Sequence, residues 1–220
     1  MKIEAIIFDL DGTLIDSMSI WQEIDVEFLK KRGIQVPKGL FEDVSGGNSF
    51  PEIAKHFKEK FKLSESIEEI MKEWVEMTIF HYKNTISLKP DVLELLKLCK
   101  AKNIKLGIGT SNNDQLTEIV LEKNRIKDYF QAIVTGDSIT NGKPFPDIFL
   151  KTAEKLNVKP QNCLVIEDVF VGIQAAKNAG MTVFMIFDEH SIHEHDKMLE
   201  IADFYAKDYR EIIEEVKNLI

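Results

Sequence analysis

The sequence predicts an α/β fold, in which a doubly wound parallel sheet carries an inserted small α-helical domain. Three observations lead to this prediction. Short apolar runs without alternation recur along the chain, segments with helical spacing separate them, and one early stretch has helical patterns only. Strands that are covered on both faces of a sheet lack alternation, and strands that alternate with helices usually form a parallel sheet.

The predicted strands are five short apolar runs. They span residues 5–8, 106–109, 132–134, 164–166 and 183–186. Segments between the strands, and the C-terminal segment, repeat apolar residues at the spacing of a helix that packs on one side. The clearest examples are Val92, Leu95, Leu96 and Cys99; Leu116, Ile119 and Val120; Ile148, Phe149, Thr152, Ala153 and Leu156; and Ile212, Ile213, Val216 and Leu219.

The stretch from residue 17 to residue 85 interrupts this alternation, because it has helix patterns but no convincing strand. Its apolar stripes are Ile20, Ile24 and Phe28, then Ile53, Phe57 and Phe61, then Ile67, Ile70, Met71 and Trp74. Stripes at helical intervals usually form the core of a helical bundle. We therefore expect a sheet domain made of residues 1–16 and 86–220, and a helical domain made of residues 17–85.

The composition excludes several classes of function. Hydrophobic residues make up 44% and charged residues 30% of the chain, and no apolar run is long enough to cross a bilayer. The stretch 2–10 is short and interrupted by Glu4 and Asp9, so we expect no signal peptide and a cytoplasmic protein. A net charge of −9 without a basic face disfavours nucleic acid as a partner. The sequence leaves the oligomeric state open, with a slight preference for a monomer.

Cysteine and histidine give no strong site. Cys99 and Cys163 lie in apolar stretches, and we expect buried free thiols. His190, His193 and His195 lie in a short polar segment, for which a solvated loop is our prediction and a surface metal site the alternative.

Polar residues follow the predicted strands at their carboxyl ends, where open parallel sheets bind ligands. The first run leads into Asp9, Asp11, Gly12 and Thr13, the second into Thr110, Ser111 and Asn112, and the fourth into Glu167 and Asp168. A further segment, 142–147, contains Lys143 between Gly142 and Pro144. We expect these side chains to meet at one edge of the sheet.

Such a meeting would bring Asp9, Asp11, Glu167 and Asp168 together. Two like charges about 4 Å apart repel by about 4 kcal/mol at an effective dielectric near 20. A hard divalent cation relieves this repulsion, and oxygen ligands with room for water suit Mg²⁺. Lys143 would add a positive charge and Thr110 a hydroxyl donor, so the site has the groups that phosphoryl transfer needs.

The same motifs, in the same order, resemble those of the haloacid-dehalogenase-like superfamily, with its Rossmann-like core. They are Asp9-x-Asp11-Gly12-Thr13, Thr110, Lys143-Pro-x-Pro-Asp, and the pair Glu167-Asp168. The helical insert resembles the cap of the subgroup with beta-phosphoglucomutases and small sugar-phosphate phosphatases.

The resemblance implies a role for each residue. Asp9 would be the nucleophile that forms a phosphoaspartate, and Asp11 the acid and base. Thr110, with backbone amides near Ser111 and Asn112, would hold phosphate, and Lys143 would balance Asp9 against it. Mg²⁺ would be bound by Asp168, the Asp9 carboxylate and the Asp11 carbonyl. Glu167 is a further ligand or a partner of the ligands, and the sequence does not decide between the two.

Substrate choice in capped members would come from the insert, where the candidates are Trp21 and the loop with Gly46, Gly47 and Asn48. Trp21 stands where the mutases resemble one another in carrying a histidine, and the loop lacks the arginine that would bind a second phosphate. Trp21 can equally be cap core. Val169 replaces a serine that many relatives carry.

The sequence thus favours a phosphatase acting on a small phosphorylated metabolite, for which a sugar phosphate is our expectation. Asp11 favours phosphorus over halide chemistry, because dehalogenases of this superfamily lack an acid there. A beta-phosphoglucomutase-type mutase is the nearest alternative. A non-catalytic module that binds a phosphometabolite is the other.

Overall fold

The computed structural model describes residues 2–37, 40 and 50–220. Its centre is a six-stranded parallel sheet in the order β3-β2-β1-β4-β5-β6. The strands are β1 (Ala5–Phe8), β2 (Lys105–Gly109), β3 (Ala132–Val134), β4 (Cys163–Glu167), β5 (Thr182–Ile186) and β6 (Phe204–Ala206). The first five confirm the predicted runs. The predicted α/β class is confirmed as well.

β1 lies at the centre of the sheet, where the strand order reverses. Phe8 pairs with Ile108 on one side and with Ile166 on the other. The residues that follow these three positions therefore leave the sheet at the same level, which is the place where open α/β sheets bind ligands. Asp9, Thr110 and Glu167 all come from this edge.

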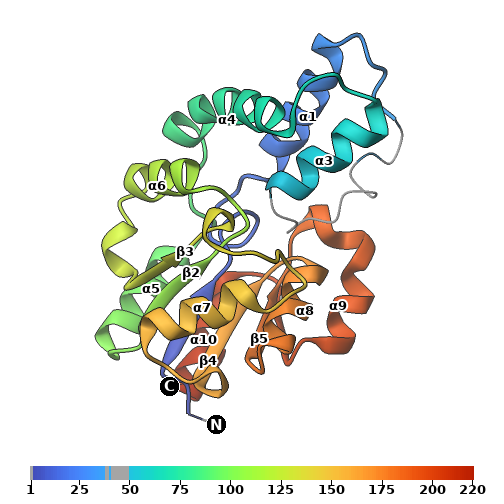
Figure 1. Ribbon diagram of the computed structural model, residues 1–220. Helices are drawn as coiled ribbons and strands as arrows, with labels where there is room; N and C mark the ends of the chain where they lie inside the picture. Colours follow the sequence, from blue (N-terminus) through green and yellow to red (C-terminus); the bar gives the residue numbers. More distant parts are fainter. Residues whose placement is uncertain (1, 38–39, 41–49) are drawn as a thin grey trace.

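Helices cover both faces of the sheet (Figure 1). The alternate residues Ala5 and Ile7 of β1 belong to one buried cluster, and Ile6 and Phe8 belong to another. This division explains why the strand is apolar throughout. The first cluster includes residues of α7 (Asp147–Leu156), α8 (Phe170–Asn178) and α9 (His195–Ile201). The second includes residues of α5 (Val92–Ala101), α6 (Asp114–Lys123) and α10 (Tyr209–Leu219).

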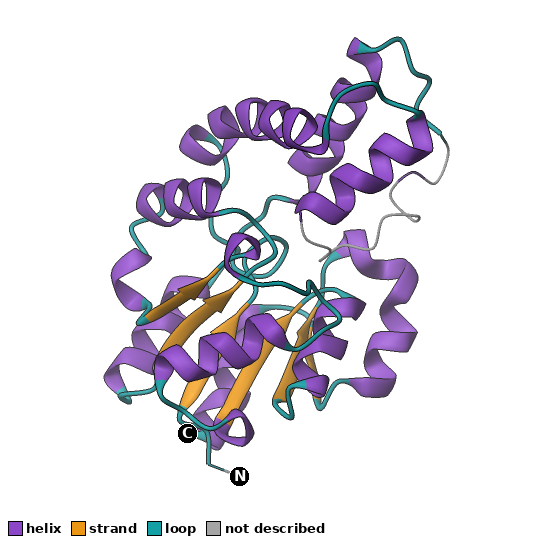
Figure 2. Cartoon of the chain, in the orientation of Figure 1, coloured by secondary structure: helices purple, strands orange, loops and turns teal. Residues whose placement is uncertain are grey.

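The insert contributes α1 (Met18–Lys31), α3 (Phe50–Phe61) and α4 (Ile67–Asn84), which we call the cap. Figure 2 shows the described part of this stretch as helices and loops, without a strand. Its centre is aromatic: the Trp74 ring lies 5.1 Å from that of Phe57 and 5.4 Å from that of Phe28. The side chain of Ser66 and that of Glu69 form a capping box at the start of α4.

The two chain connections between core and cap lie side by side. Asp16 donates its backbone N–H to Ser87 O over 3.0 Å, and Lys89 donates to Leu14 O over 2.9 Å. Ile15 and Leu88 form an antiparallel bridge between these two bonds. The cap therefore leaves and rejoins the core at one place.

The predicted loop around the three histidines is wrong. Residues Glu189–Glu194 form a 3₁₀ helix, η4, and His195 begins α9. His190 Nδ1 lies 2.9 Å from Asp188 Oδ1, while the His195 ring packs 5.3 Å from that of Tyr205. Polar residues at local hydrogen-bonding positions support short helices as well as loops.

Cys99 and Cys163 are buried and free, as predicted. None of the helices in the described part of the chain is long and apolar enough to cross a membrane.

Candidate active site

The side chain of Asp9, directly after β1, is held by Lys143. Nζ of Lys143 lies 2.6 Å from Asp9 Oδ1 and also donates to Glu167 Oε1. Lys143 comes from the loop before α7, next to the cis Lys143–Pro144 peptide bond, and its side chain is fully buried. Burial opposes its charge, but Asp9 and Glu167 together raise the pKa of Lys143 above its usual value. Lys143 therefore remains a cation between two carboxylates.

Glu167 has both carboxylate oxygens engaged. Oε1 accepts from Lys143, and Oε2 accepts from the backbone N–H groups of Asp168 over 2.8 Å and Val169 over 3.0 Å. A Cβ on Gly172 would overlap the Glu167 carboxylate, so this close approach of α8 requires glycine. The geometry gives Glu167 the position of a partner that orients Lys143 and the start of α8.

Asp168 is fully buried and has one oxygen without a partner. Thr13 Oγ1 donates to Asp168 Oδ1 over 2.6 Å, whereas Asp168 Oδ2 has no hydrogen-bond partner among the described residues. Gly12 approaches the Asp168 carboxylate closely, with a φ of 79°, and a Cβ on Gly12 would overlap Asp168 Oδ2. Tyr209 donates its hydroxyl to the Thr13 carbonyl over 3.1 Å, which supports the turn. A buried unpaired carboxylate oxygen is costly unless a cation binds it.

The donor set fits Mg²⁺. Burial raises the pKa of Asp168 well above its usual value, with Glu167 and Asp9 adding to the effect. Burial likewise raises the pKa of Asp9 to about 7, although Lys143 opposes the shift. Within residues 2–37, 40 and 50–220, no three His, Cys, Asp or Glu side chains form a metal-binding group. Asp9 and Asp168 are two buried carboxylates on this edge, and Mg²⁺ commonly binds proteins through one or two carboxylates.

Asp11 lies where core and cap meet. Its Oδ1 accepts hydrogen bonds from Ser17 Oγ over 2.6 Å, from Trp21 Nε1 over 3.1 Å and from the Tyr82 hydroxyl. Its Oδ2 accepts from Asn112 Nδ2 over 2.8 Å. Trp21, a candidate specificity residue, thus contacts the predicted acid and base directly. It also packs edge-on against Phe50 and Tyr82.

The loop after β2 is ordered by its own side chains. Asn112 donates its backbone N–H to Thr110 Oγ1 over 3.1 Å, and Asn112 Oδ1 accepts from the N–H of Asn113. Asn113 in turn caps α6, because its side chain accepts from the N–H of Leu116. Ser111, between Thr110 and Asn112 in the chain, is partly exposed. A loop at the start of a helix presents N–H groups that suit a phosphate.

The structure thus brings most of the predicted site residues together at the carboxyl edge of the sheet. Asp9, Lys143 and Glu167 form one hydrogen-bonded group, Asp11, Trp21 and Asn112 another, and Thr13 joins the turn to Asp168. Thr110 and Ser111 lie in the adjoining loop. Gly46, Gly47 and Asn48 lie outside the described residues.

Four residues of this region were missed by the sequence reasoning. Ser17 and Tyr82 contact Asp11, and Lys89 forms a 2.7 Å ion pair with Asp188 beyond β5. The charge of Lys89 lowers the pKa of Asp168, against the larger effect of burial. Asp188 could have been found, because it follows the end of a predicted strand. Tyr82 carries no such signal.

The chain is similar to known proteins over nearly its whole length. The profile of the family described as "Haloacid dehalogenase-like hydrolase" matches residues 6–186. A "Phosphorylated carbohydrates phosphatase" from Thermotoga maritima is 29% identical over 99% of this chain and 100% of its own. A "Probable pseudouridine-5'-phosphatase" from Drosophila melanogaster is 31% identical over 94% of each chain.

A solved structure gives the same picture of the fold. The beta-phosphoglucomutase from Clostridium difficile is 27% identical, with a TM-score of 0.83 over 99% of this chain and 96% of its own.

Proposed function

Because the chain belongs to the haloacid dehalogenase-like hydrolase family, we propose that it is a magnesium-dependent phosphomonoesterase. Its substrate is a small phosphorylated metabolite, and its intermediate is a phosphoaspartate on Asp9. The observation that carries the proposal is the buried Asp9 carboxylate, which Lys143 binds, together with the unpaired Oδ2 of Asp168, a carboxylate near enough for the charge of Asp9 to raise its pKa.

The first half of the reaction uses Asp9 and Asp11. A carboxylate oxygen of Asp9 attacks phosphorus, the bond from phosphorus to the leaving oxygen breaks, and Asp11 gives that oxygen its proton. Lys143 holds the attacking carboxylate by its 2.6 Å hydrogen bond and balances its charge against the phosphate. Asp9, Asp168 and the Asp11 carbonyl would hold Mg²⁺, which when bound would neutralise charge on the phosphoryl oxygens.

The second half returns the enzyme to its starting state. Asp11, now a carboxylate, takes a proton from water as the water oxygen attacks phosphorus. The bond between phosphorus and Asp9 breaks, which releases inorganic phosphate and the free carboxylate. Thr110 and the backbone amides after β2 bind the phosphoryl oxygens through both halves.

A sugar phosphate is the substrate class that we propose. The phosphatases from Thermotoga maritima and Drosophila melanogaster, by their names, act on phosphorylated carbohydrates and on pseudouridine 5'-phosphate. Both of those names describe a phosphate ester of a sugar unit, and the present chain aligns with nearly the full length of both. The cap residue Trp21, beside Asp11, would face the organic part of such an ester.

A mutase remains the second candidate, supported by the fold similarity to a beta-phosphoglucomutase. Trp21 argues against it. Its indole nitrogen only donates hydrogen bonds, so it cannot exchange protons as the histidine at that position in the mutases could. Conversion of beta-glucose 1-phosphate to glucose 6-phosphate, without release of phosphate, would overturn the phosphatase proposal.

The decisive experiment measures phosphate release from a panel of phosphorylated metabolites, with Mg²⁺ and with a chelator in its place. We expect release that requires Mg²⁺ and is highest with a sugar phosphate. Asp9→Asn should fold, as judged by its circular dichroism, and lose at least about 1,000-fold in rate. Absence of Mg²⁺-dependent release from every substrate would favour the non-catalytic binding module.

A further inference from the structure

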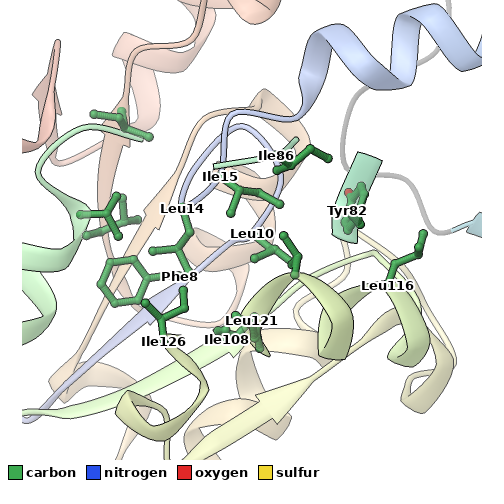
Figure 3. Close-up of a cluster of buried hydrophobic side chains, with 14 of the residues drawn as sticks. Phe8, Leu10, Leu14, Ile15, Tyr82, Ile86, Ile108, Leu116, Leu121 and Ile126 are labelled. Atoms are coloured by element: carbon green, nitrogen blue, oxygen red, sulfur yellow. The ribbon is translucent and has the colours of Figure 1, made fainter. Parts of the chain in front are cut away.

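The hydroxyl of Tyr82 lies in a closed group of polar side chains between cap and core. It contacts Asp11 Oδ1, lies 3.1 Å from Trp21 Nε1 and lies 3.0 Å from Asn112 Nδ2. The residue is fully buried near the end of α4. Its ring belongs to the buried cluster that includes Leu10, Ile15 and Leu116, and Figure 3 shows it among these side chains. A cap residue therefore reaches Asp11 without an intermediary.

The direction of each hydrogen bond follows from the groups involved. An indole N–H and a side-chain amide nitrogen only donate. The Asn112 amide is oriented by its oxygen, which accepts from the N–H of Asn113 over 2.8 Å. The Tyr82 oxygen thus accepts from Trp21 and from Asn112, and its own hydrogen is left for Asp11. A phenol keeps its hydrogen near neutral pH, so this hydrogen is donated to Asp11.

The two oxygens of Asp11 are unequally occupied. Oδ1 accepts from two hydroxyls, those of Ser17 and Tyr82, and has only a share of the single Trp21 N–H, which also points to the Tyr82 oxygen. Oδ2 accepts from Asn112 alone among the residues that the structure describes. A carboxylate oxygen has about two lone-pair sites. Oδ1 therefore has no capacity left for another hydrogen, and Oδ2 has one site open.

We propose that Tyr82 is a positioning residue for Asp11: by occupying Oδ1 it leaves Oδ2 as the oxygen that passes a proton to the leaving group. This inference rests on the proposed function, in which Asp11 protonates the leaving oxygen. The proton moves from Asp11 Oδ2 to that oxygen as its bond to phosphorus breaks. Tyr82 itself gains and loses nothing in the step.

The leaving group distinguishes positioning from a structural role. The alkoxide of a sugar phosphate needs a proton to depart, whereas 4-nitrophenolate departs without one. Loss of the Tyr82 hydroxyl should therefore slow hydrolysis of the alkyl ester and not that of the aryl ester. A merely structural role would slow both equally. kcat/KM is the parameter to compare, because it includes the step in which the leaving group departs.

The kinetic test uses Tyr82→Phe, which keeps the ring and removes the hydroxyl. We expect kcat/KM to fall by about 10-fold or more for a hexose phosphate and by less than about 3-fold for 4-nitrophenyl phosphate. The matched control is Tyr205→Phe on β6, whose ring packs against His195 away from Asp11. It should change neither value. An equal fall for both esters, or no fall for the hexose phosphate, would overturn the proposal.

A second readout does not depend on activity. The chain has two tryptophans, so its ¹⁵N–¹H spectrum holds two indole signals. Trp21 Nε1 donates within the group, whereas Trp74 Nε1 is buried without a partner among the described residues. Tyr82→Phe should move the Trp21 signal and leave the Trp74 signal in place.

An unmoved Trp21 signal would overturn the proposal whatever the rates are. A wild-type protein inactive towards both esters would instead overturn the proposed function, and the positioning role with it. In that case the Trp21 signal would still report the hydrogen bonds, so the two failures can be told apart.

Discussion

Nζ of Lys143 lies 2.6 Å from Oδ1 of Asp9, although 134 positions separate the two residues in the chain. Lys143 also donates to Glu167, and all three side chains are buried. A buried cation between two buried carboxylates stabilises the fold only as a complete set, because each charge depends on the others for compensation. The site is therefore expected to report on stability as well as on activity.

Removing the cation should destabilise the protein. We expect Lys143→Met to lower the free energy of unfolding by about 3–5 kcal/mol, because two buried carboxylates lose their partner. Urea denaturation measures this change. Lys72→Met is the control, since 78% of the Lys72 side chain is exposed, and its stability should match the wild type. Equal stability of the two variants would contradict this account of the buried triad.

Gly12 should be sensitive to the smallest side chain. Gly12→Ala places a Cβ against Asp168 Oδ2 at a φ of 79°. Gly33→Ala is the matched control, because Gly33 has a φ of 68° and open space around its Cβ position. The control should cost about 1 kcal/mol for left-handed backbone alone. Gly12→Ala should cost more than this and lose at least about 100-fold in activity.

A comparison of the two glycine variants by thermal unfolding isolates the contact with Asp168. If Gly12→Ala melted at the same temperature as Gly33→Ala and kept full activity, the close approach of the turn to Asp168 would be wrong.

Magnesium should stabilise the folded protein through Asp168. A ligand that binds only the folded state at 100 times its Kd adds about 2.7 kcal/mol to stability. We expect Mg²⁺ to raise the melting temperature of the wild type and not that of Asp168→Asn. Asp203→Asn serves as the control, since Asp203 forms an exposed ion pair with Lys177, and it should keep the response to Mg²⁺. A full response in Asp168→Asn would exclude Asp168 as a ligand.

Asp25 on α1 should make stability depend on pH. Burial raises the pKa of Asp25 to about 7, above the value of about 3.9 expected in the unfolded chain. Asp25 therefore binds its proton more tightly in the folded protein than in the unfolded chain. The contribution of this protonation to the free energy of unfolding is fully present below pH about 4 and is lost as pH rises through 7.

We therefore expect Asp25→Asn to be about 1–2 kcal/mol more stable than the wild type at pH 8, with the difference absent at pH 4. Urea denaturation across this pH range checks the trend. Glu23→Gln, an exposed position on the same helix, should show no such trend. A constant difference between pH 4 and pH 8 would contradict the raised pKa of Asp25.

The sequence predicted the parts of the fold that depend on burial from both sides. β1 and β4 are buried at every residue, so their apolar runs were visible without any partner. β6 was missed because it has only three residues, of which Phe204 and Tyr205 are half-buried at the edge of the sheet. A strand this short leaves no apolar run to recognise in the sequence. The histidine segment was misread for a related reason: its helices are short and carry polar residues that are typical of loops.

Within the site, Asp9, Thr110 and Asp168 could be predicted because each follows a strand. The contacts between distant elements could not be predicted from the sequence. Tyr82 reaches Asp11 across 71 positions, from a helix whose pattern indicates only a packed core. Whether a Glu167 oxygen is free to bind a metal depends on its hydrogen bonds with Lys143 and with two backbone N–H groups. No local sequence pattern predicts these hydrogen bonds. Spacing predicts which residues share an edge, whereas hydrogen-bond partners require the packed chain.

The paired connections between core and cap have a consequence for how the molecule is organised. Asp16 and Leu14 bond to Ser87 and Lys89, so the outgoing and returning chains are already closed against each other without the helices between them. The pairing of the two connections therefore does not depend on the helices of the cap. The length and composition of the cap can change with little entropic penalty to the sheet, because closing a longer loop costs only about 0.6 kcal/mol per doubling. Recognition can diversify while the phosphoryl chemistry stays in place.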